Sequence, residues 1–138
     1  MKNQVRHINF VFYLNFRIFW YNSHVMKRKT IRNHKDFITP RDCAMARCAF
    51  CVIKTKPAKI QGDARYGIVV SKKFFKLATL RNRAKRLLRD WIAFNEDLMI
   101  ADLDYVFIAN ESVLESNRDC GRVEIKKAFE KISKQYGK

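Results

Sequence analysis

The spacing of apolar residues after residue 25 predicts three strands. Residues 48–54 and 104–110 are short runs rich in apolar, β-branched and aromatic side chains. Residues 65–73 begin with an alternation of apolar and polar positions, which is typical of a half-buried strand. The segment 56–63 contains a proline and a glycine, so we expect a loop between the first two strands.

Helical periodicity predicts three helices around these strands. Asn33 is placed to cap a short helix that runs through Thr39 and that Pro40 ends. A long helix extends from about Thr79 to Asn95, and another covers residues 121–138. Their apolar stripes are formed by Leu80, Ala84, Leu87, Leu88 and Trp91 in the first, and by Ile125, Ala128, Phe129, Ile132 and Tyr136 in the second. These elements predict one domain in which helices pack on a sheet, an α+β or α/β sandwich.

Residues 1–25 do not share this pattern. They hold three cations and no acid, and Asn9, Asn15 and Arg17 interrupt their apolar run. These interruptions argue against a signal peptide, and against a membrane span, which needs ~20 apolar residues. We expect residues 1–25 to be an extension, either disordered or translated from a wrongly assigned start, ahead of a domain at residues 26–138.

The charge of the chain indicates a polyanionic partner. Lys and Arg number 29 against 13 acids, which gives a net charge of +16. Without residues 1–25 there are 26 cations and 13 acids, so the surplus is still +13. Such a surplus repels itself and is typical of proteins that bind nucleic acid or an acidic membrane. Because 48% of the residues are hydrophobic, we expect a folded basic domain rather than a disordered tail.

The long central helix carries an almost purely cationic polar face. Five of the thirteen residues 79–91 are Arg or Lys, and the one acid is Asp90. An ordinary solvated face includes Glu, because opposite charges four residues apart stabilise a helix by ~0.2–0.5 kcal/mol. With Thr79 near the N-cap, Arg81 and Arg83 lie in the first turn, where a cation costs ~0.3–1 kcal/mol. The pattern therefore favours phosphate binding over a solvated face.

Asn82 lies inside the tightest cluster of these cations. An amide both donates and accepts hydrogen bonds, whereas a guanidinium can only donate. Asn82 can therefore bond a ribose hydroxyl, a base edge or a metal-bound water. This chemistry suits RNA better than a row of phosphates alone.

The cysteines do not complete a metal site. Cys48 and Cys51 have the spacing of half a zinc site, but no second pair supplies the remaining ligands. On the predicted strand, residues three apart point to opposite faces. We therefore expect no zinc, and buried thiols that stay reduced in the cytoplasm.

Residues 67–91, GIVVSKKFFKLATLRNRAKRLLRDW, resemble the signature of the bacterial ribonuclease P protein component. In that family a strand ending in Gly-x-x-Val-Ser-Lys-Lys precedes a helix that carries Arg-Asn-x-x-Lys-Arg-x-x-Arg. The resemblance extends from Lys27 to the C-terminus. The matching positions of the signature are Gly67, Val70, Ser71, Lys72, Lys73, Arg81, Asn82, Lys85, Arg86 and Arg89.

The resemblance implies a fold. The family is a single α+β domain, an α-β-β-β-α-β-α two-layer sandwich similar to domain two of a small-subunit ribosomal protein. It also implies a left-handed β-α-β crossover, although nearly all such crossovers in proteins are right-handed. Nothing in the spacing of the residues predicts that handedness.

The resemblance also implies a function and partners. The family's protein is the subunit of an RNA-based endoribonuclease that removes the 5′ leader of precursor tRNA. The catalytic RNA and the Mg²⁺ that it holds hydrolyse one phosphodiester bond, and the protein has no catalytic site. We expect one protein per catalytic RNA, precursor tRNA as the second partner, no membrane and a cytoplasmic location. The residues agree, because His7, His24 and His34 all precede the strands and the acids are scattered.

Site residues follow from the resemblance. The RNA-binding surface is expected at Lys72, Lys73, Arg81, Asn82, Arg83, Lys85, Arg86 and Arg89. A cleft for the leader is expected between the first helix and the sheet, with Phe37, Phe50 and Lys54. Phe37 either stacks on an unpaired base, worth ~1–3 kcal/mol, or packs in the core.

The sequence departs from the family's pattern in two places. Residues 74–80, FFKLATL, have one residue more than the usual segment and lack its Gly-Asn pair, which leaves a protein-held metal site without support. Arg41 stands where relatives often have a second aromatic. Two other classes also fit the charge, namely a structural rRNA-binding protein of the ribosome and a DNA-binding protein with a basic helix.

Overall fold

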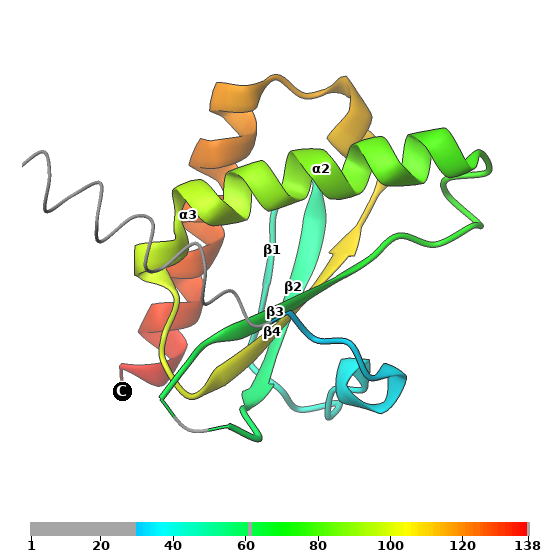
Figure 1. Cartoon of the computed structure of the whole chain (residues 1–138). Helices are drawn as coiled ribbons and strands as arrows, with labels where there is room; N and C mark the ends of the chain where they lie inside the picture. Colours follow the sequence, from blue (N-terminus) through cyan, green and yellow to red (C-terminus); the bar gives the residue numbers. More distant parts are fainter. Residues whose placement is uncertain (1–29, 61, 138) are drawn as a thin grey trace, which may run out of the picture.

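The computed structural model describes residues 30–60 and 62–137, and the predicted extension at residues 1–25 lies outside them. The chain forms one α+β domain (Figure 1). In chain order its elements are η1 (His34–Phe37), β1 (Met45–Arg47), β2 (Cys51–Pro57), β3 (Arg65–Val69), α2 (Ala78–Phe94), η2 (Glu96–Leu98), β4 (Leu103–Ala109), η3 (Glu111–Glu115) and α3 (Arg118–Tyr136), where η marks a 3-10 helix. With η1 counted as the first helix and η2 and η3 set aside, this is the α-β-β-β-α-β-α order that the resemblance implies. Strand β1 was not among the three strands predicted from the spacing.

The strands form one mixed sheet in the order β1-β2-β4-β3. β2 pairs antiparallel with β1 and with β4, whereas β3 pairs parallel with β4. Parallel neighbours need a crossover connection, and α2 provides it between β3 and β4. Because β4 lies between β2 and β3, it is fully paired, and its strand is the most buried of the four.

The first helix is shorter and tighter than predicted. The Asn33 side chain accepts a hydrogen bond from the backbone N–H of Lys35, as expected of a cap. The element that follows is a single 3-10 turn ending at Phe37, and Ile38 is already extended. The predicted helix through Thr39 is therefore wrong in length. A residue before a proline is pushed out of the helical region, which is why Thr39 cannot continue the turn.

The predicted strand over 48–54 is wrong at its start. β1 and β2 form a hairpin in which Arg47 pairs with Val52, so residues 48–50 make the turn. Cys48 donates its backbone N–H to the carbonyl of Cys51 at 3.0 Å, which closes a two-residue loop. Strand alternation therefore does not apply between Cys48 and Cys51, and their Sγ atoms lie 3.4 Å apart. The expectation that these thiols point to opposite faces was wrong.

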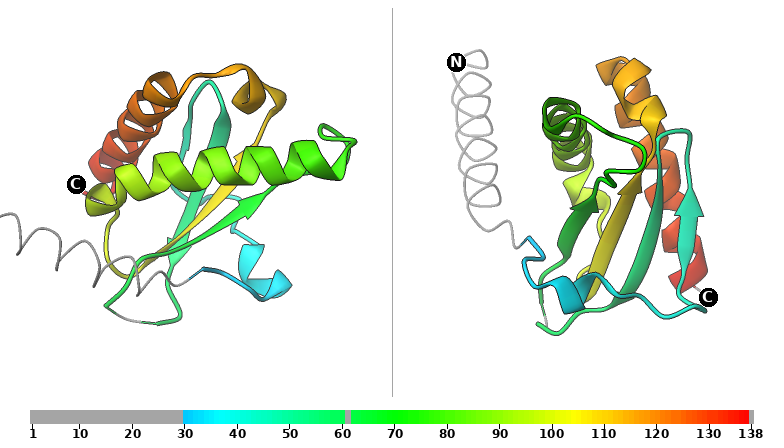
Figure 2. Two further views of the ribbon diagram at one scale, coloured as in Figure 1. Left: turned by 45° about the horizontal axis from the view of Figure 1, so that its top comes forward. Right: turned by 90° about the vertical axis from the view of Figure 1, so that its right-hand side faces the viewer.

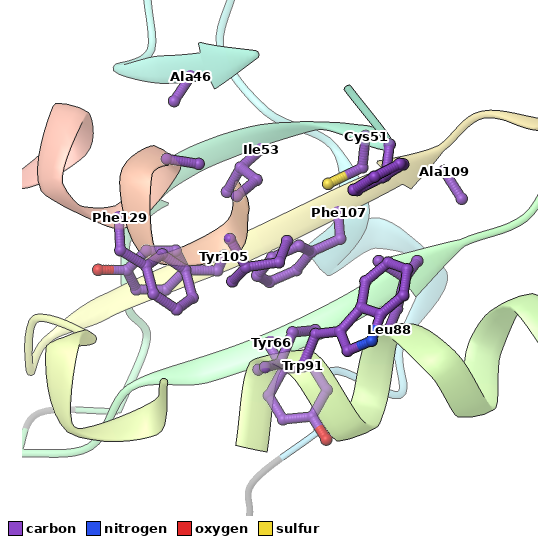
Figure 3. Packing of buried hydrophobic residues seen from close by; sticks show 14 of the residues in the cluster. Ala46, Cys51, Ile53, Tyr66, Leu88, Trp91, Tyr105, Phe107, Ala109 and Phe129 are labelled. Atoms are coloured by element: carbon purple, nitrogen blue, oxygen red, sulfur yellow. The ribbon is translucent and has the colours of Figure 1, made fainter. Parts of the chain in front are cut away.

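The two long helices cover one face of the sheet. Ala84, Leu88 and Trp91 of the predicted stripe of α2 are buried, together with Ile92, whereas Leu80 and Leu87 are half-buried against the core. The four apolar residues of α3 from Ile125 to Ile132 are buried as well, whereas Tyr136 is exposed and bonds Thr55 through its hydroxyl at 2.8 Å. The aromatic centre of the core is formed by Phe50, Trp91, Tyr105, Phe107 and Phe129 (Figure 3).

The segment from Thr30 to η1 covers part of the opposite face. Figure 2 (right) shows η1 in front of the sheet and α3 behind it. Phe37 lies against Gly67 of β3, where an added Cβ would overlap the ring. Gly67 therefore allows the first turn to approach the sheet closely.

A buried ionic network joins this segment to the sheet. Arg65 donates two hydrogen bonds to Asp104 on the neighbouring strand, at 2.9 and 2.5 Å. Its guanidinium also lies 3.9 Å from the carboxylate of Asp36, which pairs with Lys59. The hydrogen bond from Lys59 is the main cause that holds the pKa of Asp36 below its usual value. The hydrogen bonds that Arg65 donates to Asp104 likewise raise the pKa of Arg65.

We predict that Arg65→Met lowers the free energy of unfolding by ~3–5 kcal/mol, because it leaves Asp104 buried without its partner. Urea denaturation followed by circular dichroism measures the change. Asp104→Leu in the same chain removes the orphaned charge and should recover most of the loss. If the double variant is no more stable than Arg65→Met, the loss comes from packing of the arginine stem and not from the ion pair.

Cys48 is predicted to be a low-pKa thiol. Its hydrogen bond with Cys51 lowers the pKa of Cys48 from 9.0 to about 6, whereas the same bond and burial raise the pKa of Cys51. Because the thiolate is the nucleophile, alkylation of Cys48 by iodoacetamide should rise with pH around a midpoint near 6. In Cys51→Ala the midpoint should move up toward the ordinary thiol value. A midpoint unchanged by Cys51→Ala contradicts the assignment.

Candidate RNA-binding surface

Helix α2 presents its basic side chains to solvent because its apolar side is buried in the core. Ala84, Leu88 and Trp91 fix the helix on the sheet, and Arg86 and Arg89, which lie between these positions, are exposed. Of the predicted RNA-binding residues on α2, four are exposed and two are half-buried. The exposed ones are Asn82, Arg83, Arg86 and Arg89, and the half-buried ones are Arg81 and Lys85.

These cations are not neutralised by nearby acids. Within residues 30–60 and 62–137, Arg83, Lys85, Arg86 and Arg89 form no ion pair. The one acid of the helix, Asp90, faces α3 instead.

Asp90 accepts hydrogen bonds from Arg118 and Arg122 at 3.3 Å. Burial alone would raise the pKa of Asp90, but these two arginines outweigh it and the pKa is lowered. The acid therefore holds α3 against α2 and leaves the basic face uncompensated.

The N-terminus of α2 differs from the prediction. The helix begins at Ala78, its N-cap Leu77 makes no side-chain cap, and its first turn has no acid. Arg81 therefore lies at the end of the first turn and Arg83 in the second, beyond the strongest field of the helix dipole. Arg81 donates to the carbonyls of Phe75 and Lys76 at 2.8 and 3.0 Å, so it holds the preceding loop in place. The argument that two first-turn arginines require an anion was wrong.

Lys72 and Lys73 are exposed in the turn that connects β3 to α2. Ser71 shapes this turn, because its Oγ accepts a hydrogen bond from the backbone N–H of Lys73 at 3.1 Å. Lys73 also lies over the ring of Phe74, with Nζ 5.7 Å from the centroid. The two lysines thus lie in the connection that leads into α2, and their role in extending its basic face stays a prediction.

The three residues predicted for a leader cleft are not brought together. Phe37 is half-buried over Gly67 and Lys54 is partly exposed on β2, both on the side of the sheet away from the long helices. Phe50 is buried on the other side, with its ring centroid 5.3 Å from that of Trp91. Phe50 belongs to the hairpin turn and not to strand β2. The strand alternation that placed Phe50 on the same face as Lys54 therefore does not apply to it.

Sequence reasoning missed Arg47, a cation on the face that Lys54 shares. Arg47 is exposed on β1 and pairs with Val52, the neighbour of Lys54 on that side of β2. Paired residues of adjacent strands project from the same face of a sheet. A strand of three residues has too little alternation to be recognised, so Arg47 could be placed only by its pairing.

None of the helices among the described residues is long and apolar enough to cross a membrane. Among the same residues, no group of three or more His, Cys, Asp or Glu side chains is arranged to hold a metal ion.

Comparison with solved structures finds the same fold. The structure is similar to that of the Staphylococcus aureus RNase P protein, with a TM-score of 0.62 and 24% identity over 75% of this chain and 94% of that one. It is also similar to the RNase P protein from Thermotoga maritima, with a TM-score of 0.61 and 23% identity over 72% of this chain and 94% of that one. At this identity the likeness shows the fold, a single α+β domain with a four-stranded mixed sheet.

Sequence comparison identifies the family. A ribonuclease P protein component from Pseudomonas entomophila (strain L48) is 47% identical over 49 residues, which are 36% of this chain and 36% of that protein. The component from Baumannia cicadellinicola subsp. Homalodisca coagulata is 33% identical over 72 residues, or 52% of this chain and 58% of that one. These matches span from about a third to little more than half of the relatives' length. The family model Ribonuclease P matches residues 25–133, and the chain therefore belongs to the bacterial ribonuclease P protein family.

Proposed function

We propose that this chain is the protein subunit of a ribonuclease P, the RNA-based endoribonuclease that removes the 5′ leader of precursor tRNA. The observation that carries the proposal is the uncompensated basic face of α2, in a chain that belongs to this family. The partners are a catalytic RNA, with one protein per RNA, and precursor tRNA. The location is the cytoplasm, where both RNAs are made.

The basic face acts by lowering repulsion between phosphates. Each arginine or lysine that meets a phosphate releases a bound counterion, which favours association at low salt. Arg83, Arg86 and Arg89 are the main contacts in this account because they are exposed and unpaired among the described residues. Lys72, Lys73 and Lys85 extend the surface, and Asn82 bonds a ribose or base edge. Arg81 acts as a positioning residue that keeps the loop before α2 in shape.

We assign the leader to the face of the sheet opposite the long helices. Lys54 and Arg47 supply positive charge there, and Phe37 presents a half-buried ring beside the sheet. A ring in this position packs on Gly67 with one side and can stack on a base with the other, so the two roles considered for Phe37 are compatible. Phe50 has no part in this cleft because it is buried against Trp91.

The chemistry of cleavage belongs to the RNA. The proposal implies Mg²⁺, which we assign to the catalytic RNA, and the described residues offer no cluster of acids or histidines fitted to it. What the chain contributes is binding and orientation, which bring the scissile phosphate and the catalytic RNA together.

Two finer features of the proposal concern the fold. We expect the β3-α2-β4 crossover to be left-handed and the domain to resemble domain two of a small-subunit ribosomal protein. We also propose that the functional domain is residues 26–138 and that residues 1–25 are dispensable. A structural rRNA-binding protein of the same architecture is the alternative.

A processing assay tests the proposal. The purified chain, mixed with the ribonuclease P RNA of the same genome and a precursor tRNA at low Mg²⁺, should release the 5′ leader faster than the RNA alone does. The reason is that the basic face screens the phosphates that Mg²⁺ otherwise has to screen. A chain that begins at Met26 should perform equally well. No acceleration by either chain, together with tight binding to ribosomal RNA, would favour the ribosomal alternative.

Substitutions on the exposed side of α2 should affect RNA binding, whereas substitutions on its buried side should affect stability. Arg86→Ala and Arg89→Ala should leave stability within ~0.5 kcal/mol, because both side chains are exposed. Each should weaken binding to the catalytic RNA and reduce the slope of log K against log salt by roughly 0.7–0.9. Filter binding over a salt series measures both quantities.

Leu88→Ala is the matched control on the buried side of the same helix. It should cost ~2–5 kcal/mol of stability, because Leu88 is completely buried, and leave the salt slope unchanged in the fraction that stays folded. If the arginine variants keep the wild-type slope, the basic face does not contact phosphates.

A further inference from the structure

Two adjacent phenylalanines in the loop before α2 have opposite environments. Phe75 is 1% exposed and belongs to the core, whereas Phe74 is 47% exposed. An isolated exposed apolar residue is common on proteins, so exposure alone does not assign a role. The surroundings of Phe74 are what distinguish it.

The loop holds Phe74 outward in a fixed position. The backbone N–H groups of Phe74 and Phe75 both donate to the carbonyl of Ser71, at 3.2 and 3.0 Å. Arg81 donates hydrogen bonds to the carbonyls of Phe75 and Lys76. The buried side chain of Phe75 anchors the loop to the core. A ring held in this way loses little freedom when it binds a partner, and pre-organisation of this kind strengthens binding.

The surroundings of the ring are cationic. Lys72, Lys73 and Lys76 are exposed on either side of Phe74, and the ammonium of Lys73 lies over the ring. The chain has no Asp or Glu from Ala64 to Arg89. A second copy of this domain would bring the same positive loop or basic face against it, which is electrostatically unfavourable.

We propose that Phe74 stacks on an unpaired base of the RNA partner, while the lysines around it bind the adjacent phosphates. A paired helix hides the faces of its bases, so only an unpaired nucleotide offers both a π-face and neighbouring phosphates. The assignment rests on the proposed function in that the RNA is the catalytic RNA. It adds a stacking contact to a surface that otherwise binds by charge.

The experiment compares Phe74→Leu with Phe74→Trp and with Phe94→Leu. Phe94 is the matched control, an aromatic that is 60% exposed near the far end of α2, with the Arg122 guanidinium over its ring. Phe74→Leu should weaken binding to the ribonuclease P RNA between about 5-fold and 150-fold, as loss of one stacked base does. Phe74→Trp should restore binding, and Phe94→Leu should leave it at the wild-type level.

Two further readings separate stacking from charge and from the proposed function. The salt slope of Phe74→Leu should equal that of the wild type, because no phosphate contact is lost, whereas Lys73→Ala should reduce it. A short single-stranded RNA should show the loss for Phe74→Leu, and the same strand annealed to its complement should not. This pair of probes tests the stacking contact even if the chain fails to process precursor tRNA.

Three results would overturn the inference. One is wild-type affinity of Phe74→Leu for both the ribonuclease P RNA and the single strand. Another is an equal loss for single-stranded and double-stranded RNA. The third is unchanged RNA binding with a loss of self-association in sedimentation, which would make the loop a contact between copies of the chain.

Discussion

Burial of Trp91 is the interaction on which the basic surface depends. Its indole is completely buried between the hairpin turn at Phe50 and helix α3. Gly121 of α3 faces the indole, and an added Cβ there would overlap the ring, so the two helices can approach only with glycine at this position. The indole N–H has no hydrogen-bond partner among the described residues, which costs ~1–3 kcal/mol. The contact is retained because it orients α2, and the orientation of α2 decides which side of the helix faces solvent.

The placement of acids completes this division between the two sides of α2. Asp90 pairs with Arg118 and Arg122 and so joins α2 to α3, while Asp104 and Asp36 surround Arg65 beneath η1. In both places a carboxylate stabilises the interior or a helix contact. These three acids therefore do not screen the cations of the outer face, which repel one another until an anion binds.

Elements with long periodicity could be predicted from sequence, and those set by distant contacts could not. The buried centre of the α2 stripe and the exposure of Arg86 and Arg89 could be predicted because seventeen residues of helix carry several turns of the same pattern. Strand β1 has only three residues, so its pairing with β2 and the position of Arg47 could not be predicted from the sequence. The same hairpin moved Phe50 into the core and brought Cys48 next to Cys51. The ion pairs of Arg65 could not be predicted, because its partners Asp36 and Asp104 are remote in sequence.

We propose that the arginines left unpaired on α2, and not those engaged in ion pairs, contact the RNA. Nuclear magnetic resonance of the arginine Nε–H groups during titration with the ribonuclease P RNA tests it most directly. The account predicts that the signals of Arg83, Arg86 and Arg89 shift or broaden first, while that of Arg65, buried against Asp104, stays in place. Changes confined to Arg118 and Arg122, with Arg83, Arg86 and Arg89 unaffected, would contradict it.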